Sequence, residues 1–378
     1  MTKEVKTNAK IPLVRIAKRT NISRFKSWGV RIIAVIIALL INAIVIYSIT
    51  NLNPIEVYKS MFLGAFGTSR RLWSTVKEVA FLLCISVALA PAFKMRFWNI
   101  GAEGQVLVGG IATAACMIYL GDTLSTPLLF LVMVLASIVA GAVWGLIPAL
   151  FKANWNTNET LFTLMMNYIA IQLTSYFVAK WENPYGSNTV GIINKTTKAG
   201  WFPSLFGKEY MLNVIIVLAL TIIVFLYLKF SKQGYEIAVV GESENTARYA
   251  GINVKKVIIR TMAISGALCG IAGFIGVSGA SHTISTNTAG GRGFTAIIIA
   301  WLAKFNTLTM ILISTLIVFL DQGAKQIVSD FSKLGINDNV ADILKGIILF
   351  FILGSEFFVN YRLVFRHKHS HEDNKVTE

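Results

Sequence analysis

Charged residues are scarce in this chain. Of its 378 residues, 14% are Asp, Glu, Lys or Arg and 55% are hydrophobic, whereas a soluble globular domain carries roughly a quarter charged residues. The composition therefore excludes an ordinary soluble enzyme and indicates an integral membrane protein.

Cysteine is scarce as well. Cys84, Cys116 and Cys269 all lie inside apolar stretches and show no CxxC spacing. An odd number of isolated cysteines supports neither a disulfide framework nor a metal site. We interpret the three as small core residues.

Groups that hold nucleotides or carry catalysis are also missing. The chain has no GxxxxGK[ST] motif, whose glycine-rich loop and lysine hold ATP phosphates, so it cannot itself be an ATP-hydrolysing motor. His367, His369 and His371 stand on a charged terminus without a second ligand cluster. We expect no metal, no cofactor and no enzymatic activity.

What the chain does contain is a series of long apolar runs. About twenty apolar residues are needed to cross a bilayer, because backbone amides in lipid must find hydrogen bonds inside their own segment. The first run is too long for a signal-peptide core and lacks a clear cleavage site behind it. The predicted fold is all-α, a polytopic membrane protein of about ten transmembrane helices near residues 31–49, 76–93, 104–120, 128–151, 161–179, 211–228, 257–280, 294–303, 308–322 and 343–359.

The basic residues that give the net charge of +16 lie mostly between the apolar runs, and nine of the 35 lie from Lys3 to Arg31. An excess of Lys and Arg marks the cytoplasmic side of a membrane protein. We expect a multi-pass protein of a bacterial inner or plasma membrane, with no nucleic-acid partner. A basic arm at 1–30 and a charged tail at 362–378 would be cytoplasmic and flank a transmembrane domain at 31–361.

Two interruptions depart from a plain helix bundle. Polar and small residues interrupt the apolar sequence between Trp98 and Gln105, and Gly290, Gly291 and Gly293 precede a short apolar segment of about ten residues. Broken helices at membrane depth are tolerated only around a cavity or inside protein. We therefore predict a discontinuous or re-entrant helical element.

Small residues repeat every four positions in the seventh apolar run. Gly266 and Gly270 are followed by Ala272, Gly276 and Ala280. Such spacing lets two helix backbones approach closely. It predicts a seam between helices.

The longest predicted inward loop spans residues 234–260. Ser243 can cap a short helix that runs to Ala250, and Gly251 suits the left-handed position just past its end. A short helix on the cytoplasmic face has the shape needed to push against a separate motor protein. An ordinary amphipathic connector is the alternative.

Three motifs now carry a resemblance. NIGAEGQ at 99–105, NETLFTLMMNYIA at 158–170 and GESENTARYAGI at 241–252 resemble the permease subunits of nucleoside and simple-sugar ABC importers, over about residues 31–361. The resemblance implies import of nucleosides or a related sugar-containing solute. It also implies a second permease subunit in a heterodimer, a cytoplasmic ABC ATPase and an extracellular solute-binding lipoprotein, all working in membrane lipid.

The same resemblance implies roles for two sets of residues. In the family, the loop that matches 241–252 docks in the ATPase, which gives coupling roles to Gly241, Glu242, Asn245, Ala247, Ala250 and Gly251. The region of 99–105 would line the solute path. The Asn167 amide could add weak hydrogen bonds to a solute in this path, and aromatic rings could contact the face of a base or sugar. We therefore expect the path to be lined by Trp98, Asn99, Glu103, Gln105, Asn167 and Phe294.

Packing between helices remains the alternative for each path residue. Glu103 in particular could lie in the first turn of a helix capped by Asn99, where the helix dipole favours an anion. The other open alternatives concern the class of transporter. They are a permease for branched-chain amino acids, urea or simple sugars, and an ion-coupled secondary transporter that would depend on Glu103 as its membrane-embedded acid.

Overall fold

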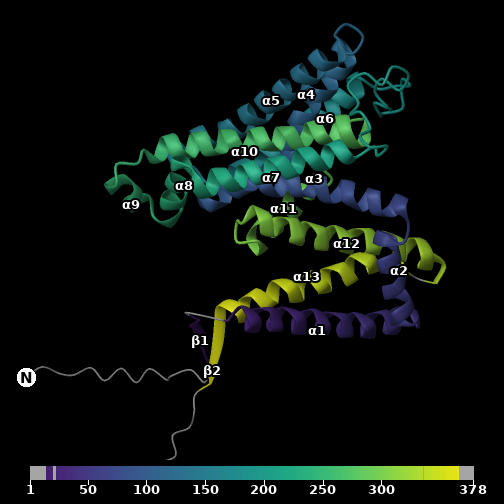
Figure 1. Ribbon diagram of the computed structural model, residues 1–378, viewed down its shortest axis with the longest axis vertical. Coiled ribbons are helices and arrows are strands. Elements are labelled where there is room, and N and C mark those ends of the chain that lie inside the picture. The colour runs from purple at the N-terminus through teal and green to yellow at the C-terminus, as the bar shows by residue number, and fades with distance from the viewer. Residues whose placement is uncertain (1–13, 20–22, 335, 366–378) are drawn as a thin grey trace, which may run out of the picture. The chain divides into compact units, whose positions relative to one another are not determined.

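The computed structural model describes residues 14–19, 23–334 and 336–365 of the chain. Helices make up most of the described part (Figure 1), so the predicted all-helical class is confirmed. The elements in chain order are β1 Val14–Lys18, α1 Arg24–Thr50, α2 Pro54–Phe66, α3 Ser69–Lys94, α4 Ala102–Leu120, α5 Thr126–Trp155, α6 Glu159–Lys180, α7 Met211–Phe230, α8 Lys232–Glu242, α9 Glu244–Tyr249, α10 Val254–Gly276, the π-helical turn η1 Val277–Ser281, α11 Arg292–Leu302, α12 Thr307–Phe331, the 3-10 turn η2 Ser332–Leu334, α13 Asp338–Asn360 and β2 Tyr361–Phe365.

Eight of the described helices are long and apolar enough to cross a membrane, namely α1, α3, α4, α5, α6, α7, α10 with η1, and α12. The sequence predicted about ten crossings. The two remaining predicted segments, 294–303 and 343–359, correspond to α11 and α13, and α11 has only 11 residues. Helices α2 and α8 were missed because, with 13 and 11 residues, they are shorter than the apolar runs that the prediction sought.

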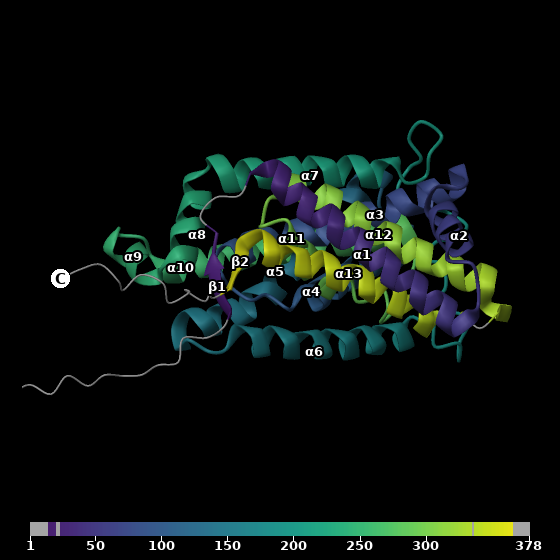
Figure 2. The same cartoon turned by 90° about the horizontal axis from the view of Figure 1, so that it is seen from below.

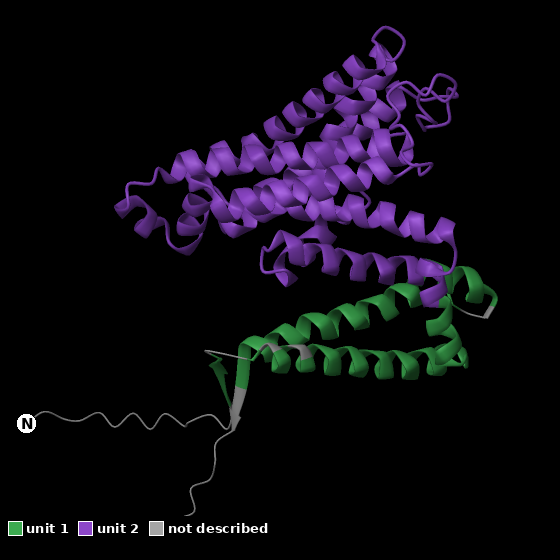
Figure 3. Cartoon of the chain, viewed as in Figure 1, with its two compact units in different colours: residues 1–60, 324–378 green, residues 61–323 purple. Residues whose placement is uncertain are grey.

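The chain forms two compact units (Figure 3): unit 1 takes in Met1–Ser60 and Ala324–Glu378, and unit 2 takes in Met61–Gly323. The boundary passes through α2 and α12. The predicted division into arm, membrane domain and tail follows charge rather than compactness and stays a prediction.

Unit 1 is built on the pair α1 and α13, which pack against each other. Arg31 Nε donates to Glu356 Oε1 at 3.0 Å and so ties the two helices by an ion pair. Strand β1 pairs antiparallel with β2, and Val14 lies opposite Phe365. The sequence did not predict these strands, because each is only five residues long and its partner lies at the other end of the chain.

Unit 2 is organised around α10, which packs on α3, α4 and α5, while α6 and α7 lie along opposite edges of the unit in Figure 2. The predicted seam lies where α10 meets α5. A Cβ atom on Gly266 would overlap the carbonyl oxygen of Gly141, and one on Gly270 would overlap that of Ser137. The two backbones are therefore in direct contact, as small residues at a membrane helix interface allow.

This contact gives a stability prediction. Replacing Gly270 with alanine should force α5 and α10 apart and destabilise the protein by about 1–3 kcal/mol, the usual cost of overpacking. The measurement is the midpoint of thermal unfolding of the purified protein in detergent. Gly354→Ala is the matched control, because a Cβ there meets open space; equal midpoints for both variants would contradict the seam.

Candidate functional site

The break between α3 and α4 places a buried amide pair at the start of α4. The Asn99 and Gln105 side chains exchange two hydrogen bonds of 3.3 Å. Asn99 Oδ1 also accepts from the Gly101 amide at 3.0 Å, and Asn99 Nδ2 donates to Ser265 Oγ of α10 at 3.4 Å. Both amides are almost completely buried, so they hold the broken segment against α10.

Helix α6 supplies the partners for the main chain that the break exposes. Asn167 Oδ1 accepts from the Gly104 amide at 2.8 Å, and Asn167 Nδ2 donates to the Ile100 carbonyl at 2.9 Å. Thr163 Oγ1 accepts from the Ile100 amide at 3.1 Å. Backbone groups freed at membrane depth need such partners, because lipid offers none.

Glu103 joins this first turn of α4 to the start of the short helix α11. Its side chain is buried, with 6% of the residue exposed. Oε1 accepts from the Gly291 amide at 2.7 Å, and Oε2 accepts from the Gly293 amide at 2.8 Å. The first amides of a helix lack partners within the helix and carry its positive dipole end, so Glu103 caps α11 across the bundle.

A second acid holds the same end of α11. Arg292, the first residue of α11, forms an ion pair with Glu78 of α3, and its guanidinium lies 5.3 Å from the centre of the Phe81 ring. The start of α11 is thus fixed to α4 by Glu103 and to α3 by Glu78.

Aromatic rings form the exposed part of this region. Trp98, Phe294 and Trp301 keep 41%, 45% and 48% of their surface exposed, and we call these three residues the aromatic surface. The Trp98 and Trp301 ring centroids lie 5.2 Å apart. Phe294 and Trp301 are seven residues apart on α11 and therefore lie on one helix face.

A second candidate region lies at the end of unit 2 that carries α8 and α9, where α9 projects beyond its neighbours (Figure 1). Ser243 caps α9 by accepting from the Thr246 amide at 3.2 Å. Gly251, with φ +75°, donates its amide to the Arg248 carbonyl at 3.0 Å. The predicted short helix, its cap and its left-handed glycine are confirmed.

The surface of α9 is almost entirely open. Ala247 is fully buried, whereas Tyr249 is 95% exposed and Asn245 is exposed. Arg248 and Glu244 form an exposed ion pair of 3.3 Å along the helix. Apart from Ala247, the side chains of α9 are therefore open to solvent.

Helix α8 connects α9 to the core. Gly241 is buried so tightly that a Cβ there would overlap the carbonyl oxygen of Lys94, at the end of α3. Arg260 Nη2 of α10 pairs with Glu236 Oε2 of α8 at 2.9 Å. Helix α8 is therefore in contact with both α3 and α10.

The opposite end of α10 contacts a long loop, residues 181–210. The Phe202 amide donates to the Ser278 carbonyl at 3.2 Å, and Trp201 stacks on His282 with ring centroids 3.8 Å apart. Burial lowers the pKa of His282 and so favours its neutral form. Tyr185 stands out from this loop with 95% of its surface exposed.

The sequence profile of one family, described as the permease component of the branched-chain amino acid transport system, matches residues 71–353. The chain belongs to this permease family. That match takes in the break before α4, Glu103, α11 and the α8–α9 region, so both candidate regions lie within it.

Three characterised proteins are similar to this permease over nearly their whole length. The guanosine ABC transporter permease protein NupP of Bacillus subtilis is 28% identical over 340 residues, which cover 88% of this chain and 95% of NupP. The nucleoside ABC transporter permease protein NupB of Lactococcus lactis is 27% identical, covering 85% of this chain and 90% of NupB. The glucose ABC transporter permease protein TsgB13 of Haloferax volcanii is 25% identical, covering 93% of each chain.

The permease brings most of the predicted path residues together around the first turn of α4. Asn99, Gln105 and Asn167 are buried and have protein partners, Glu103 caps α11, and the rings of Trp98 and Phe294 are half exposed. Their role in a solute path stays a prediction.

Among the predicted coupling residues, Gly241 and Ala247 are buried, and Glu242, Asn245, Ala250 and Gly251 are exposed. The exposed four can meet a partner directly, whereas the buried two can act only by holding α8 and α9 in place.

Sequence reasoning missed five residues of the region, Glu78, Thr163, Ser265, Arg292 and Trp301. The seven-residue spacing from Phe294 to Trp301 was a usable signal for the last. No sequence signal connected Thr163 or Ser265 to the break, because their partners lie on other helices. The tail histidines lie outside the described residues.

Glu103 gives the second prediction. Glu103→Ala should leave the buried Gly293 amide of α11 and the exposed Gly291 amide just before it without their acceptor. The loss should destabilise the permease by about 1–3 kcal/mol, the usual desolvation cost of one unsatisfied buried group. The stability of Glu103→Gln, which keeps one acceptor oxygen, should lie between that of Glu103→Ala and that of the native protein. Thermal unfolding in detergent measures both.

Glu244→Ala is the control for this pair, since Glu244 is exposed on α9 and surface ion pairs contribute little. If Glu103→Ala and Glu244→Ala unfolded at the same temperature as the native protein, Glu103 would not be the cap of α11.

Proposed function

We propose that this permease is the membrane-spanning subunit of an ATP-driven importer for nucleosides. The observation that carries the proposal is the family match together with two relatives, named for guanosine and for nucleosides, that align over nearly their full length. The glucose permease is somewhat less identical. A sugar-containing solute agrees with all three names, and a nucleoside contains both a sugar and a base.

The aromatic surface supports a path for such a solute. A base or sugar ring can lie against the half-exposed rings of Trp98, Phe294 and Trp301, because aromatic side chains offer large contact area without fixed hydrogen bonds. Weak contacts suit a conduit, since tight binding would trap the cargo. In this proposal Asn99, Glu103 and Asn167 shape the path by holding the main chain around it, and Gln105 holds the Asn99 side chain.

Power is supplied by a separate subunit in this proposal. The chain lacks a phosphate-binding GxxxxGK[ST] motif, and a cytoplasmic ABC ATPase would grip the exposed side of α9. Closure of the ATPase would pull α8 and so shift α3 and α10. Alternating access requires a partner whose contact energy differs between the two states of the permease, and here that partner would be the ATPase.

The remaining partners follow from the same orientation. If α9 and both chain ends lie in the cytoplasm, as proposed, the loop of residues 181–210 faces the exterior, where an extracellular solute-binding lipoprotein would deliver the cargo. A second permease subunit would complete the path on the side of the aromatic surface.

Uptake in the native host tests the substrate class. An in-frame deletion of this chain should reduce uptake of radiolabelled guanosine and uridine to background, and the intact gene should restore it, whereas leucine uptake should not change. Depletion of ATP with the membrane potential maintained should abolish the restored uptake. Loss of leucine or glucose uptake with normal nucleoside uptake would instead assign the chain to one of the alternative solutes.

The coupling helix gives a separate prediction. Tyr249→Ala should weaken co-purification of the ATPase by about thirtyfold or more and slow uptake accordingly, because an exposed tyrosine at the centre of an interface contributes on the order of 2 kcal/mol. Affinity pull-down of the ATPase at graded concentrations measures this.

Tyr185→Ala is the matched control, since Tyr185 is equally exposed but lies on the loop at the opposite end. If the two variants retained the ATPase equally well, α9 would not be the docking element, even with nucleoside uptake intact.

A further inference from the structure

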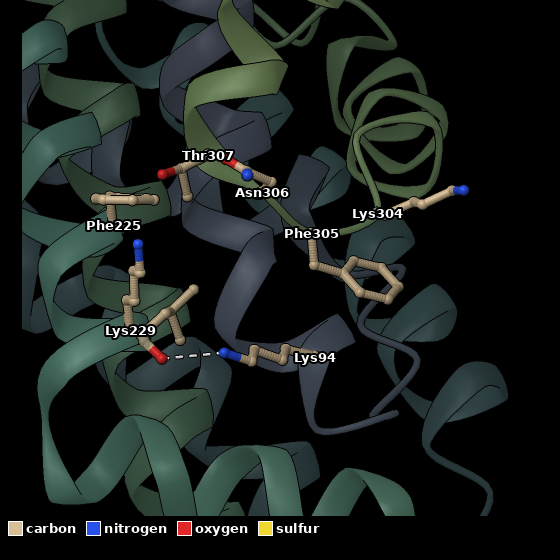
Figure 4. A pocket seen from close by; sticks show the side chains of 8 residues that line it. Lys94, Phe225, Lys229, Lys304, Phe305, Asn306 and Thr307 are labelled. Atoms are coloured by element: carbon tan, nitrogen blue, oxygen red, sulfur yellow. Dashed lines mark hydrogen bonds between the residues drawn. The ribbon is translucent and has the colours of Figure 1, made fainter. Parts of the chain in front are cut away.

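A pocket of about 270 Å³ lies in unit 2 beside the start of α8 (Figure 4). The end of α3, the last turns of α7 and the turn at residues 304–307 between α11 and α12 form its walls. None of its lining residues is among the predicted path or coupling residues.

Two lysines bring positive charge to this pocket. Lys94 Nζ donates to the Leu228 carbonyl at 3.0 Å, shown as the dashed line in Figure 4. Lys229 Nζ lies over the Phe225 ring, 5.2 Å from its centre. An ammonium group has three donors, so both lysines keep donors to offer. None of the described residues that line the pocket is acidic.

The turn that closes the pocket has an unusual backbone. Lys304 and Phe305 have φ values of 49° and 61°, a left-handed conformation that bulky residues rarely adopt. Such strain persists only where the surroundings hold it and often accompanies a functional site. The Lys304 side chain itself points away from Lys94 and Lys229 in Figure 4.

The apolar wall of the pocket continues onto a face of α7 that is suited to lipid. Phe225 and Leu228 line the pocket, and Ile222, Leu226 and Phe230 on the same helix are 52%, 48% and 70% exposed. Both α3 and α7 are long enough to cross the membrane. Lysines in the last turns of such helices lie at the membrane surface, where lipid headgroups are found.

We propose that this pocket binds the phosphate headgroup of an anionic phospholipid. Lys94 and Lys229 donate to the phosphate oxygens, and the acyl chains run along Phe225 and the exposed face of α7. Basic pockets between membrane helices on the cytoplasmic side have the charge that such headgroups need. A soluble phosphate would gain nothing from the apolar wall, and therefore the lipid is the better fit.

Native mass spectrometry of the full-length chain in mild detergent tests the proposal, with phosphatidylglycerol and phosphatidylcholine as probes. The native protein should retain phosphatidylglycerol in preference to phosphatidylcholine. Each lysine near an anionic surface strengthens binding about fivefold. Lys229→Gln should therefore weaken phosphatidylglycerol retention about fivefold, and the double variant Lys94→Gln/Lys229→Gln should weaken it about thirtyfold. Lys232→Gln is the control, because Lys232 is an exposed lysine of α8 outside the pocket.

Replacing both lysines with arginine should preserve retention, because arginine keeps the positive charge. Lys229→Gln alone removes no hydrogen bond that holds α7, so its effect on retention reports the loss of charge and not a loss of folding. Equal phosphatidylglycerol retention by the double glutamine variant and the native protein would overturn the proposal. Displacement of the lipid by millimolar inorganic phosphate would make the pocket a site for a soluble anion. Unchanged lipid retention with weaker ATPase binding would make it a surface for an acidic partner, and either outcome overturns the lipid site.

Discussion

The structure of unit 2 depends on how an interrupted backbone satisfies its hydrogen bonds where water is absent. Two interruptions, one before α4 and one before α11, meet at a single helical turn. Glu103 accepts from the Gly291 and Gly293 amides, and the next residue, Gly104, donates its own amide to Asn167. Each unpaired group would cost several kcal/mol in lipid. One turn of α4 therefore holds α6 and α11, and through Asn99 and Ser265 it also holds α10.

This arrangement divides labour between polar and aromatic side chains. The amides and carboxylate of the region are committed to hydrogen bonds within the protein, whereas the rings of Trp98, Phe294 and Trp301 are exposed. A surface that offers rings and no fixed polar partners binds a passing solute weakly and adapts to several bases or sugars. In the proposed importer, discrimination among solutes then belongs largely to the extracellular binding protein, and the conduit supplies passage.

The sequence predicted those features of the fold that depend on neighbouring residues in the chain. Ser243 and Gly251 were assigned their cap and left-handed positions correctly, because both depend on neighbours within a few residues. The break and the glycine-rich start of α11 were also visible as departures from apolar sequence. The sequence did not reveal the partner of Glu103, because Gly291 lies 188 residues away along the chain. The dipole argument was sound, but it was applied to the helix of Glu103 itself and not to α11.

The same contacts argue against the alternative function of an ion-coupled transporter. That mechanism needs a membrane-embedded acid whose oxygens can exchange partners with a cation during each cycle. Both oxygens of Glu103 accept main-chain hydrogen bonds that hold α11, and Glu78 is paired with Arg292 at the same helix end. A cation bound at either acid would compete with bonds that keep the half-helix in place. The two acids therefore fit a structural role, and in the proposed importer the movement would come from the ATPase through α9 and α8.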